Sequence, residues 1–241
     1  MKYKHSFRDY KQYLWYLLPT IYFNFKMLPF RQAKKLPFLF VKPKFIQLKG
    51  KVEIDDDICR FGLVKLGSWG VKAFPNTGIK LNLQGGTWKI KGKVWIGANS
   101  SIEVGKQGCL EMGDNFMAST SLKLCCYYKT TFGEGHRFGW NCTVMDTNFH
   151  PLKKVETGEK KRAGAPIEIG SHNWCATNNV IMPGVKTPDY CIFGYGTVLT
   201  RNMPCEEYAV HGGSPVRVLS RGYYRDLDDD RDPAVFNEGH K

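Results

Sequence analysis

The chain has 241 residues, of which 42% are hydrophobic, enough to bury a substantial core in one large domain or two small ones. Its net charge of +13 is unevenly distributed, because the first fifty residues hold eleven basic residues and one acidic residue. Phosphate binding requires a basic face on the folded scaffold, and the remainder of the chain is nearly neutral. The charge pattern therefore disfavours nucleic acid as a partner.

Residues 1–45 form a basic, aromatic-rich segment. Its most apolar stretch, residues 13–25, contains Pro19 and Asn24 and is too short for a membrane span of about 20 residues. No small-residue cleavage site follows, which disfavours a secretory signal. Two interpretations stay open. The favoured one is a partly helical cap on the first coil of the fold, and the other is an interfacial helix at an anionic inner leaflet.

From residue 46 onward, apolar residues recur at a spacing of six, imperfectly at first and more regularly from Ile90. Residues 69–86 break the pattern, which predicts a loop or a distorted coil, and residues 147–164 form a second, longer interruption. A period of six is neither helical nor strand-like, but it is typical of a hexapeptide β-helix, in which inward anchors stack from coil to coil. The anchors of residues 165–215 are Ile169, Cys175, Ile181, Thr187, Phe193 and Leu199.

Eight cysteines lie at irregular spacings, without a CxxC pair. We expect reduced thiols that pack as small apolar residues in a cytoplasmic protein, and no structural zinc site. The last residues are acidic, which predicts a solvated C-terminal tail over residues 216–241. The acidic cluster consists of Asp226, Asp228, Asp229, Asp230 and Asp232.

Three motifs resemble those of a known family: PIEIGSHNW at residues 166–174, IMPGV at 181–185 and GGSPVRV at 212–218. Over residues 138–221 the chain resembles the hexapeptide-repeat acyltransferases, and among them the sugar and polysaccharide O-acetyltransferases. The resemblance implies an all-β fold, a left-handed parallel β-helix over residues 46–215. It also implies a homotrimer, with acetyl-CoA held between neighbouring β-helices and no metal.

The loop sequence NFHPL at residues 148–152 matches the family's catalytic loop, so we predict His150 as the general base. Transfer to a sugar hydroxyl requires such a base, and the free pKa of histidine, near 6.5, suits it. Asp146 is predicted to orient the imidazole, with a turn-forming aspartate as the alternative. No Ser or Cys stands out as a covalent nucleophile, and the resemblance implies direct transfer within a ternary complex.

The remaining site residues are predicted from their places in the motifs. Trp140, Asn141 and Trp174 are predicted to contact the acceptor, because aromatic faces stack on sugars and Asn both donates and accepts. The predicted cofactor contacts are Thr177, Gly194, Tyr195, Thr200, Arg201 and, at the nucleotide phosphates, Arg217.

Several positions depart from the family's pattern. Tyr195 stands where the family usually has Ala, and the anchors at Cys175 and Thr187 replace Ile. Ser119 occupies the place of a substrate-contacting Asn in the galactoside and maltose branch. This difference favours a polysaccharide or a lipid-linked glycan over a small sugar.

The predicted function is a cytoplasmic O-acetyltransferase acting on a sugar or a bacterial surface polysaccharide precursor, with peripheral contact of residues 1–45 with the inner membrane left open. Two alternatives remain. A γ-type carbonic anhydrase requires three zinc-bound histidines with one close pair, whereas His136, His150 and His172 are 14 and 22 residues apart. The second is a non-catalytic β-helix scaffold, which the substituted anchors favour.

Overall fold

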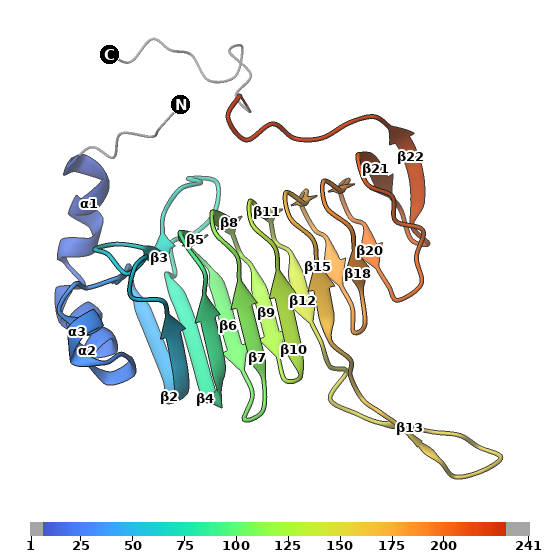
Figure 1. The fold of residues 1–241 in the computed structure, drawn as a ribbon, viewed down its shortest axis with the longest axis horizontal. Helices are drawn as coiled ribbons and strands as arrows, with labels where there is room; N and C mark the ends of the chain where they lie inside the picture. Colours follow the sequence, from blue (N-terminus) through green and yellow to red (C-terminus); the bar gives the residue numbers. More distant parts are fainter. Residues whose placement is uncertain (1–6, 230–241) are drawn as a thin grey trace.

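Parallel strands wind into a β-helix in the computed structural model, which describes residues 7–229 (Figure 1). Each regular coil contributes three short strands, and each strand pairs in parallel with its counterparts in the coils before and after it. The β-helix therefore has three faces, separated by three corners at which the chain turns. The prediction of an all-β, left-handed parallel β-helix with a partly helical N-terminal cap is confirmed.

The first face is a nine-stranded sheet. It consists of β1 (Phe38–Phe40), β3 (Val64–Ser68), β5 (Val94–Gly97), β8 (Phe116–Thr120), β11 (Arg137–Trp140), β16 (Trp174–Cys175), β19 (Ile192–Phe193), β21 (Ala209–Gly212) and β22 (Arg217–Arg221).

The other two faces share the long strands β2 (Pro43–Ile54) and β4 (Ile79–Ile90), which pair along their length. The second face continues with β6 (Ser100–Val104), β9 (Lys123–Cys126), β12 (Thr143–Met145), β17 (Val180–Ile181) and β20 (Val198–Leu199). The third face continues with β7 (Cys109–Met112), β10 (Lys129–Phe132), β15 (Ile167–Ile169) and β18 (Lys186–Thr187).

Apolar side chains stack in columns inside the β-helix, as the six-residue period predicts. On the first face, Phe138, Cys175 and Phe193 are successive buried members of one column. The small Cys175 fits between two large rings, so its departure from the usual anchor preserves close packing. At the other unusual anchor, the hydroxyl of Thr187 accepts a 2.7 Å hydrogen bond from the buried Asn173 side chain. All eight cysteines are free thiols, as predicted.

The first interruption of the period, expected over residues 69–86, is a loop over residues 69–78, after which β4 begins at Ile79. Residues 79–90 escape the six-residue pattern because β4 runs as one extended strand over two faces. Buried residues recur there with a period of two on either side of residues 84 and 85, neither of which is buried and between which the phase shifts.

Residues 222–229 of the C-terminal tail are mostly exposed, but the tail also contacts the folded coils. Strand β22 turns back antiparallel to β21, and the chain then runs back over the coils (Figure 1). The Tyr224 ring meets the Tyr190 ring edge-on at 6.0 Å, and the Arg225 guanidinium covers the Trp174 ring at 4.7 Å. Of the acidic cluster, the side chains of residues 226, 228 and 229 are exposed, and residues 230 and 232 lie outside the described residues.

Three helices lie at the N-terminal end of the β-helix: α1 (Phe7–Leu14), α2 (Leu17–Met27) and α3 (Phe30–Ala33) (Figure 1). The buried Phe23 of α2 packs its ring 4.8 Å from Phe38 and 4.9 Å from Phe40, both in β1. The α2 helix thus covers the free edge that an open stack of strands would expose. No helix within residues 7–229 is long and apolar enough to cross a membrane.

Candidate functional site

The three corners of the β-helix arrange the predicted site residues. The first corner follows the strands of the first face, the second corner follows those of the second face, and the third corner follows those of the third face. Their members include Asn141, Asn178 and Tyr195 at the first corner, Asp146 and Arg201 at the second, and His172, Tyr190 and Tyr208 at the third.

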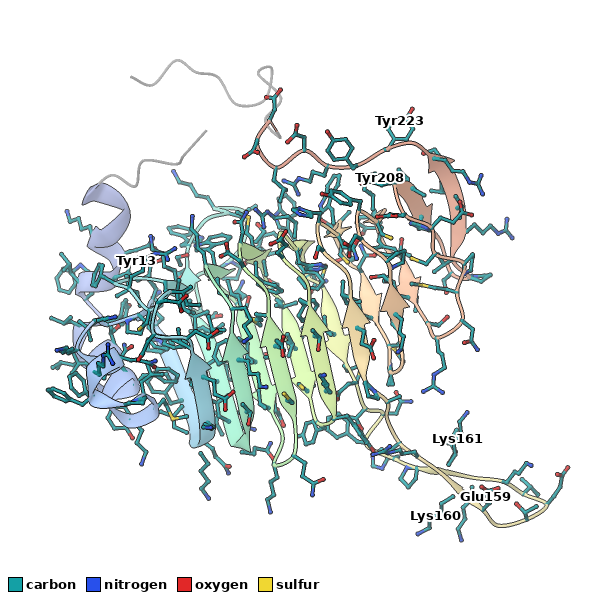
Figure 2. All side chains as sticks on the ribbon, viewed as in Figure 1. Tyr13, Glu159, Lys160, Lys161, Tyr208 and Tyr223 are labelled. Atoms are coloured by element: carbon teal, nitrogen blue, oxygen red, sulfur yellow. The ribbon has the colours of Figure 1, made fainter. Side chains whose placement is uncertain are left out.

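At the second corner, residues 147–164 leave the β-helix as an extended hairpin, here called the arm (Figure 1). Thr147 and Gly164 form an antiparallel bridge, and the Asn148 amide donates to the Ala163 carbonyl at 2.8 Å. Farther out, β13 (Leu152–Lys153) pairs with β14 (Lys160–Lys161). Figure 2 shows the side chains of Glu159, Lys160 and Lys161 on the outer part of this arm, and all three are exposed.

His150 lies at the root of the arm and is exposed. The preceding residue, Phe149, adopts a left-handed backbone conformation (φ 61°), its amide donates to the Thr147 hydroxyl at 3.0 Å, and its ring packs edge-on against Tyr127 at 5.1 Å. The backbone on one side of His150 is thereby fixed. Within residues 7–229 the imidazole makes no hydrogen bond, so both ring nitrogens are open to a ligand.

Asp146 is buried directly beneath the arm. Its carboxylate accepts hydrogen bonds from the backbone amides of Tyr127 at 2.7 Å and Tyr128 at 2.9 Å, and from the Thr130 hydroxyl at 3.4 Å. Burial raises the pKa of this carboxyl, partly offset by the two amides. Within the described chain these contacts favour the structural role left open by the sequence, because they tie the root of the arm to the preceding coil.

A cavity of about 630 Å³ opens beside the root of the arm. Phe149, the residue before His150, lines this cavity, whereas His150 itself is not among the lining residues. Above Tyr128 the guanidinium of Arg162 lies 4.8 Å from the ring centroid, a cation–π contact. The lining residues are Gln107, Tyr127, Tyr128, Lys129, Thr147, Phe149, Arg162, Ala163 and Pro166. Aromatic faces with a few polar groups suit a sugar ring.

At the first corner, two predicted residues are joined through a third that the sequence did not single out. The Asn141 side-chain amide donates to the Asn178 side-chain oxygen at 2.8 Å, and the Asn178 amide donates to the Tyr195 hydroxyl at 2.6 Å. The Tyr195 side chain is nevertheless 72% exposed, so this chain of hydrogen bonds positions a ring that faces outward. Asn178 adopts a left-handed backbone conformation at its corner (φ 62°), as Asn141 does one coil earlier (φ 56°). Asparagine is one of the few residue types that adopt this conformation readily, so its recurrence at corner positions is the sequence feature that could have identified Asn178.

Trp140 and Thr177 join the same corner. The Trp140 indole donates to the Ser119 hydroxyl at 3.2 Å, and its ring meets Phe74 edge-on at 5.4 Å. The hydroxyl of Thr177 accepts a long, 3.5 Å bond from the Trp140 amide. Ser119, whose identity departs from the family's pattern, thus anchors a predicted acceptor residue.

The remaining predicted residues are spread over the molecule. Thr200 and Arg201 lie at the second corner in a later coil than the arm, and Arg201 packs over Gly184, where a Cβ would collide with the guanidinium. Arg217, in β22, borders a cavity of about 300 Å³ that also contacts residues 212–215. Gly194 follows β19 and donates its amide to the His211 carbonyl at 2.8 Å. Trp174 does not join the other predicted acceptor residues, because it lies near the third corner beneath Arg225.

Among the described residues, His136, His150 and His172 lie in different parts of the β-helix. His136 is sealed in the core among the rings of Phe116, Phe132 and Phe138. Within residues 7–229 the donor atoms of Cys191, Cys205 and His211 lie within 4.8 Å of one another. However, the Nε2 atom of His211 already accepts from the Glu206 amide at 3.0 Å and its Nδ1 atom faces the Ile192 carbonyl at 3.2 Å, so the group does not fit an ion as it stands.

The geometry thus defines a parallel β-helix protein that carries a basic arm, with an exposed histidine at the root of that arm. No protein-family model matches the chain. It is 29% identical over 132 residues to galactoside O-acetyltransferase of Escherichia coli, an alignment covering 55% of this chain and 61% of that protein. It is also 30% identical over 92 residues to a Staphylococcus aureus protein that is provisionally named an acetyltransferase, covering 38% of this chain and 43% of that one.

Among solved structures, a polysialic-acid-specific acetyltransferase gives a TM-score of 0.45 at 15% identity, over 79% of this chain and 85% of that one. A galactoside acetyltransferase in complex with coenzyme A gives 0.39 at 24% identity, over 59% of this chain and 64% of that one. The chain thus spans less than two thirds of the length of the curated relatives. Their names confirm the resemblance to sugar acetyltransferases that the motifs indicate.

Proposed function

We propose that the protein is a cytoplasmic O-acetyltransferase. It moves an acetyl group from acetyl-CoA to a hydroxyl of a sugar, within a bacterial surface polysaccharide or its lipid-linked precursor. The observation that carries the proposal is the position of His150, exposed at the root of the arm and directly after Phe149, which lines a cavity of about 630 Å³ together with aromatic and basic residues. The similarity to a galactoside O-acetyltransferase supports the same chemistry.

In the proposed reaction, a nitrogen of His150 accepts the proton of the sugar hydroxyl while the hydroxyl oxygen attacks the thioester carbonyl carbon. The tetrahedral intermediate collapses with cleavage of the carbon–sulfur bond. The proton then passes from the imidazolium to the departing thiolate, so the products are an acetyl ester and free coenzyme A. Because the His150 imidazole makes no hydrogen bond within residues 7–229, an orienting group for its second nitrogen has to come from the substrate, the solvent or a neighbouring subunit.

The second face is the surface on which acetyl-CoA is proposed to lie, since it runs between the first corner, with Thr177 and Tyr195, and the second, with Thr200 and Arg201. The guanidinium groups of Arg201 and Arg217 suit the nucleotide phosphates. A single flat face encloses no ligand, so the opposite wall is assigned to another subunit. The proposed assembly is a homotrimer.

The proposal is tested by isothermal titration of acetyl-CoA and by mass spectrometry of acetyl transfer onto a panel of sugars, acidic and neutral oligosaccharides and undecaprenyl-linked glycans. A His150→Ala variant is expected to keep its affinity for acetyl-CoA and to lose turnover by about 10² or more. A His172→Ala variant, which removes a histidine near the third corner, is the matched control and should keep turnover.

Failure of the protein to bind acetyl-CoA would eliminate the acetyltransferase and favour a non-catalytic scaffold. Full turnover in His150→Ala would assign the base to another residue. Sedimentation velocity of the purified chain tests the homotrimer separately, because a monomer that still transfers acetyl groups would remove the neighbouring subunit from the site.

A further inference from the structure

The α2 helix has two different faces. Its inner face is fully used: Thr20, Phe23 and Asn24 are buried against β1. Its outer face, continued by residues before and after the helix, is apolar and open to solvent. We call this set the apolar face. It consists of Leu14, Trp15, Leu17, Leu18, Ile21, Tyr22, Phe25 and Phe30.

The exposure of the apolar face is high for such residues. Trp15 is 83% exposed, Leu18 is 81% exposed and Phe30 is 73% exposed. Leu18, Ile21 and Phe25 are three and four residues apart and therefore lie on one side of α2, while Leu14 ends the preceding helix α1. Scattered exposed apolar residues are ordinary, but a contiguous group of this size marks a surface that binds something.

Basic side chains flank the apolar face. Lys11, Lys26 and Lys34 are exposed and make no ion pair within residues 7–229, while Arg31 pairs loosely with Asp56 at 3.4 Å. The neighbouring acidic turn is partly neutralised, since Asp55 also faces Lys91 at 3.5 Å. The first fifty residues contain eleven basic residues and one acidic residue, so the end of the molecule that carries the apolar face attracts anions.

We propose that the apolar face docks onto an anionic phospholipid bilayer. The α2 helix, with 11 residues, is about 16 Å long and lies in the plane of the interface, with Trp15, Leu18 and Phe30 inserted among the acyl chains. The flanking lysines meet the headgroups, each contributing about 1 kcal/mol near a negative leaflet. Trp and Tyr favour this boundary because one part of the side chain is apolar and another is polar.

A second protein surface is the less suitable occupant. Lysine is depleted at protein–protein interfaces, whereas Lys11, Lys26 and Lys34, which make no ion pair with another described side chain, flank this patch in the sequence. The helices lie at the N-terminal end of the β-helix, beyond β2 (Figure 1). Membrane docking there leaves the second face and the arm uncovered, so it is independent of whether the protein is an acetyltransferase.

The test is co-sedimentation of the full chain with sucrose-loaded vesicles. Vesicles of equimolar phosphatidylglycerol and phosphatidylcholine are compared with vesicles of phosphatidylcholine alone. The wild type is expected to bind the anionic vesicles preferentially, and less strongly as salt is raised. A Trp15→Ser/Leu18→Ser variant should bind about tenfold or more weakly, because less apolar surface is inserted. A Lys11→Glu/Lys26→Glu/Lys34→Glu variant should lose the preference for the anionic lipid.

The matched control is Val155→Ser/Leu219→Ser, which removes two exposed apolar side chains elsewhere and should bind like the wild type. Circular dichroism and thermal melting confirm that every variant is folded. Equal binding by Trp15→Ser/Leu18→Ser and the wild type overturns the proposal, as does a wild type that remains in the supernatant with anionic vesicles. Sedimentation velocity in which Trp15→Ser/Leu18→Ser dissociates the wild-type oligomer also overturns it, because the apolar face then contacts a second copy.

Discussion

The side chain of Asn24 bonds both backbone groups of Phe38: its amide donates to the Phe38 carbonyl at 2.9 Å, and its oxygen accepts from the Phe38 amide at 3.1 Å. A second bond from the Asn24 amide reaches the Thr20 carbonyl at 2.8 Å. A single buried side chain thus takes the place of a neighbouring strand at the free edge of β1. This reciprocal pairing explains how a helix ends a stack of strands without leaving buried backbone groups unpaired.

Replacing this group should therefore destabilise the fold strongly. Asn24→Leu keeps a side chain of similar volume but leaves the buried N–H and C=O of Phe38 without their hydrogen-bond partner. We expect a loss of about 2–4 kcal/mol in the free energy of unfolding. Thr20→Val, which removes a longer 3.3 Å bond from the Phe40 amide, should cost about 1 kcal/mol. Urea unfolding followed by circular dichroism measures both. Equal losses of unfolding free energy in the two variants would show that the paired bonds of Asn24 to Phe38 stabilise the fold no more than the single bond of Thr20 to Phe40.

His136 should make the fold acid-sensitive. Burial lowers the pKa of His136 to about 3 from an ordinary value of 6.5, and neither ring nitrogen has a hydrogen-bond partner in the described chain. Between pH 6.5 and 3, the His136 imidazole is protonated in the unfolded chain and stays neutral in the folded chain. The free energy of unfolding therefore falls as the pH drops, by up to about 1.4 kcal/mol per pH unit.

A His136→Leu variant removes this contribution and the two unpartnered nitrogens. We expect it to be more stable than the wild type at pH 7.5, and the advantage to widen by about 1 kcal/mol at pH 5.5. Urea midpoints at the two pH values give the comparison, with His172→Leu as a partly exposed control. A constant difference between His136→Leu and the wild type would contradict the assigned cause.

Asp146 distinguishes anchoring of the arm from orientation of the imidazole. If its carboxylate only fixes the backbone at Tyr127 and Tyr128, Asp146→Asn should keep one of the two amide bonds and lose less than about tenfold in turnover, whereas Asp146→Ala should lose more. Both should make the arm more susceptible to limited proteolysis. A loss of 10² or more in Asp146→Asn, with an intact arm, would instead support direct orientation of His150.

The hydrogen-bonded chain at the first corner should act as a unit. Asn178→Ala releases the Tyr195 ring, and Tyr195→Phe removes the hydroxyl that Asn178 reaches. If that ring borders the acetyl-CoA site, each change should raise the KM for acetyl-CoA several-fold with little effect on kcat. The double variant should be no worse than the more severe single variant, since both break the same bond. Additive effects would show that the two side chains act separately.

The regular part of the fold was predictable because each coil repeats the same burial problem. Ile181 and Leu199 face inward at equivalent places in successive coils, and the spacing of six records this directly. Where a substituted anchor occurs, as at Cys175, the column still holds because its neighbours are larger. The six-residue period is lost at β4, because this single strand continues from the second face to the third without an intervening turn.

The site was less predictable, because hydrogen bonds between coils leave little trace in a linear sequence. The motif located His150, but nothing in it showed that the Asp146 carboxylate accepts hydrogen bonds from backbone amides of the preceding coil. The partnership of Asn178 with Tyr195 depends on corners that are adjacent only in three dimensions. The path of the tail over Trp174 likewise depends on how β22 turns back, not on its acidic composition.

The bridge between Thr147 and Gly164 brings the two ends of the arm together. The coil would therefore close whether the excursion between them held sixteen residues or a handful, and the stacking of later coils does not depend on its length or composition. The sequence of the arm can therefore change in evolution without a matching change in the β-helix. If the acceptor binds beside the arm as proposed, exchange of residues 148–163 between related β-helices would change the acceptor and leave the frame intact.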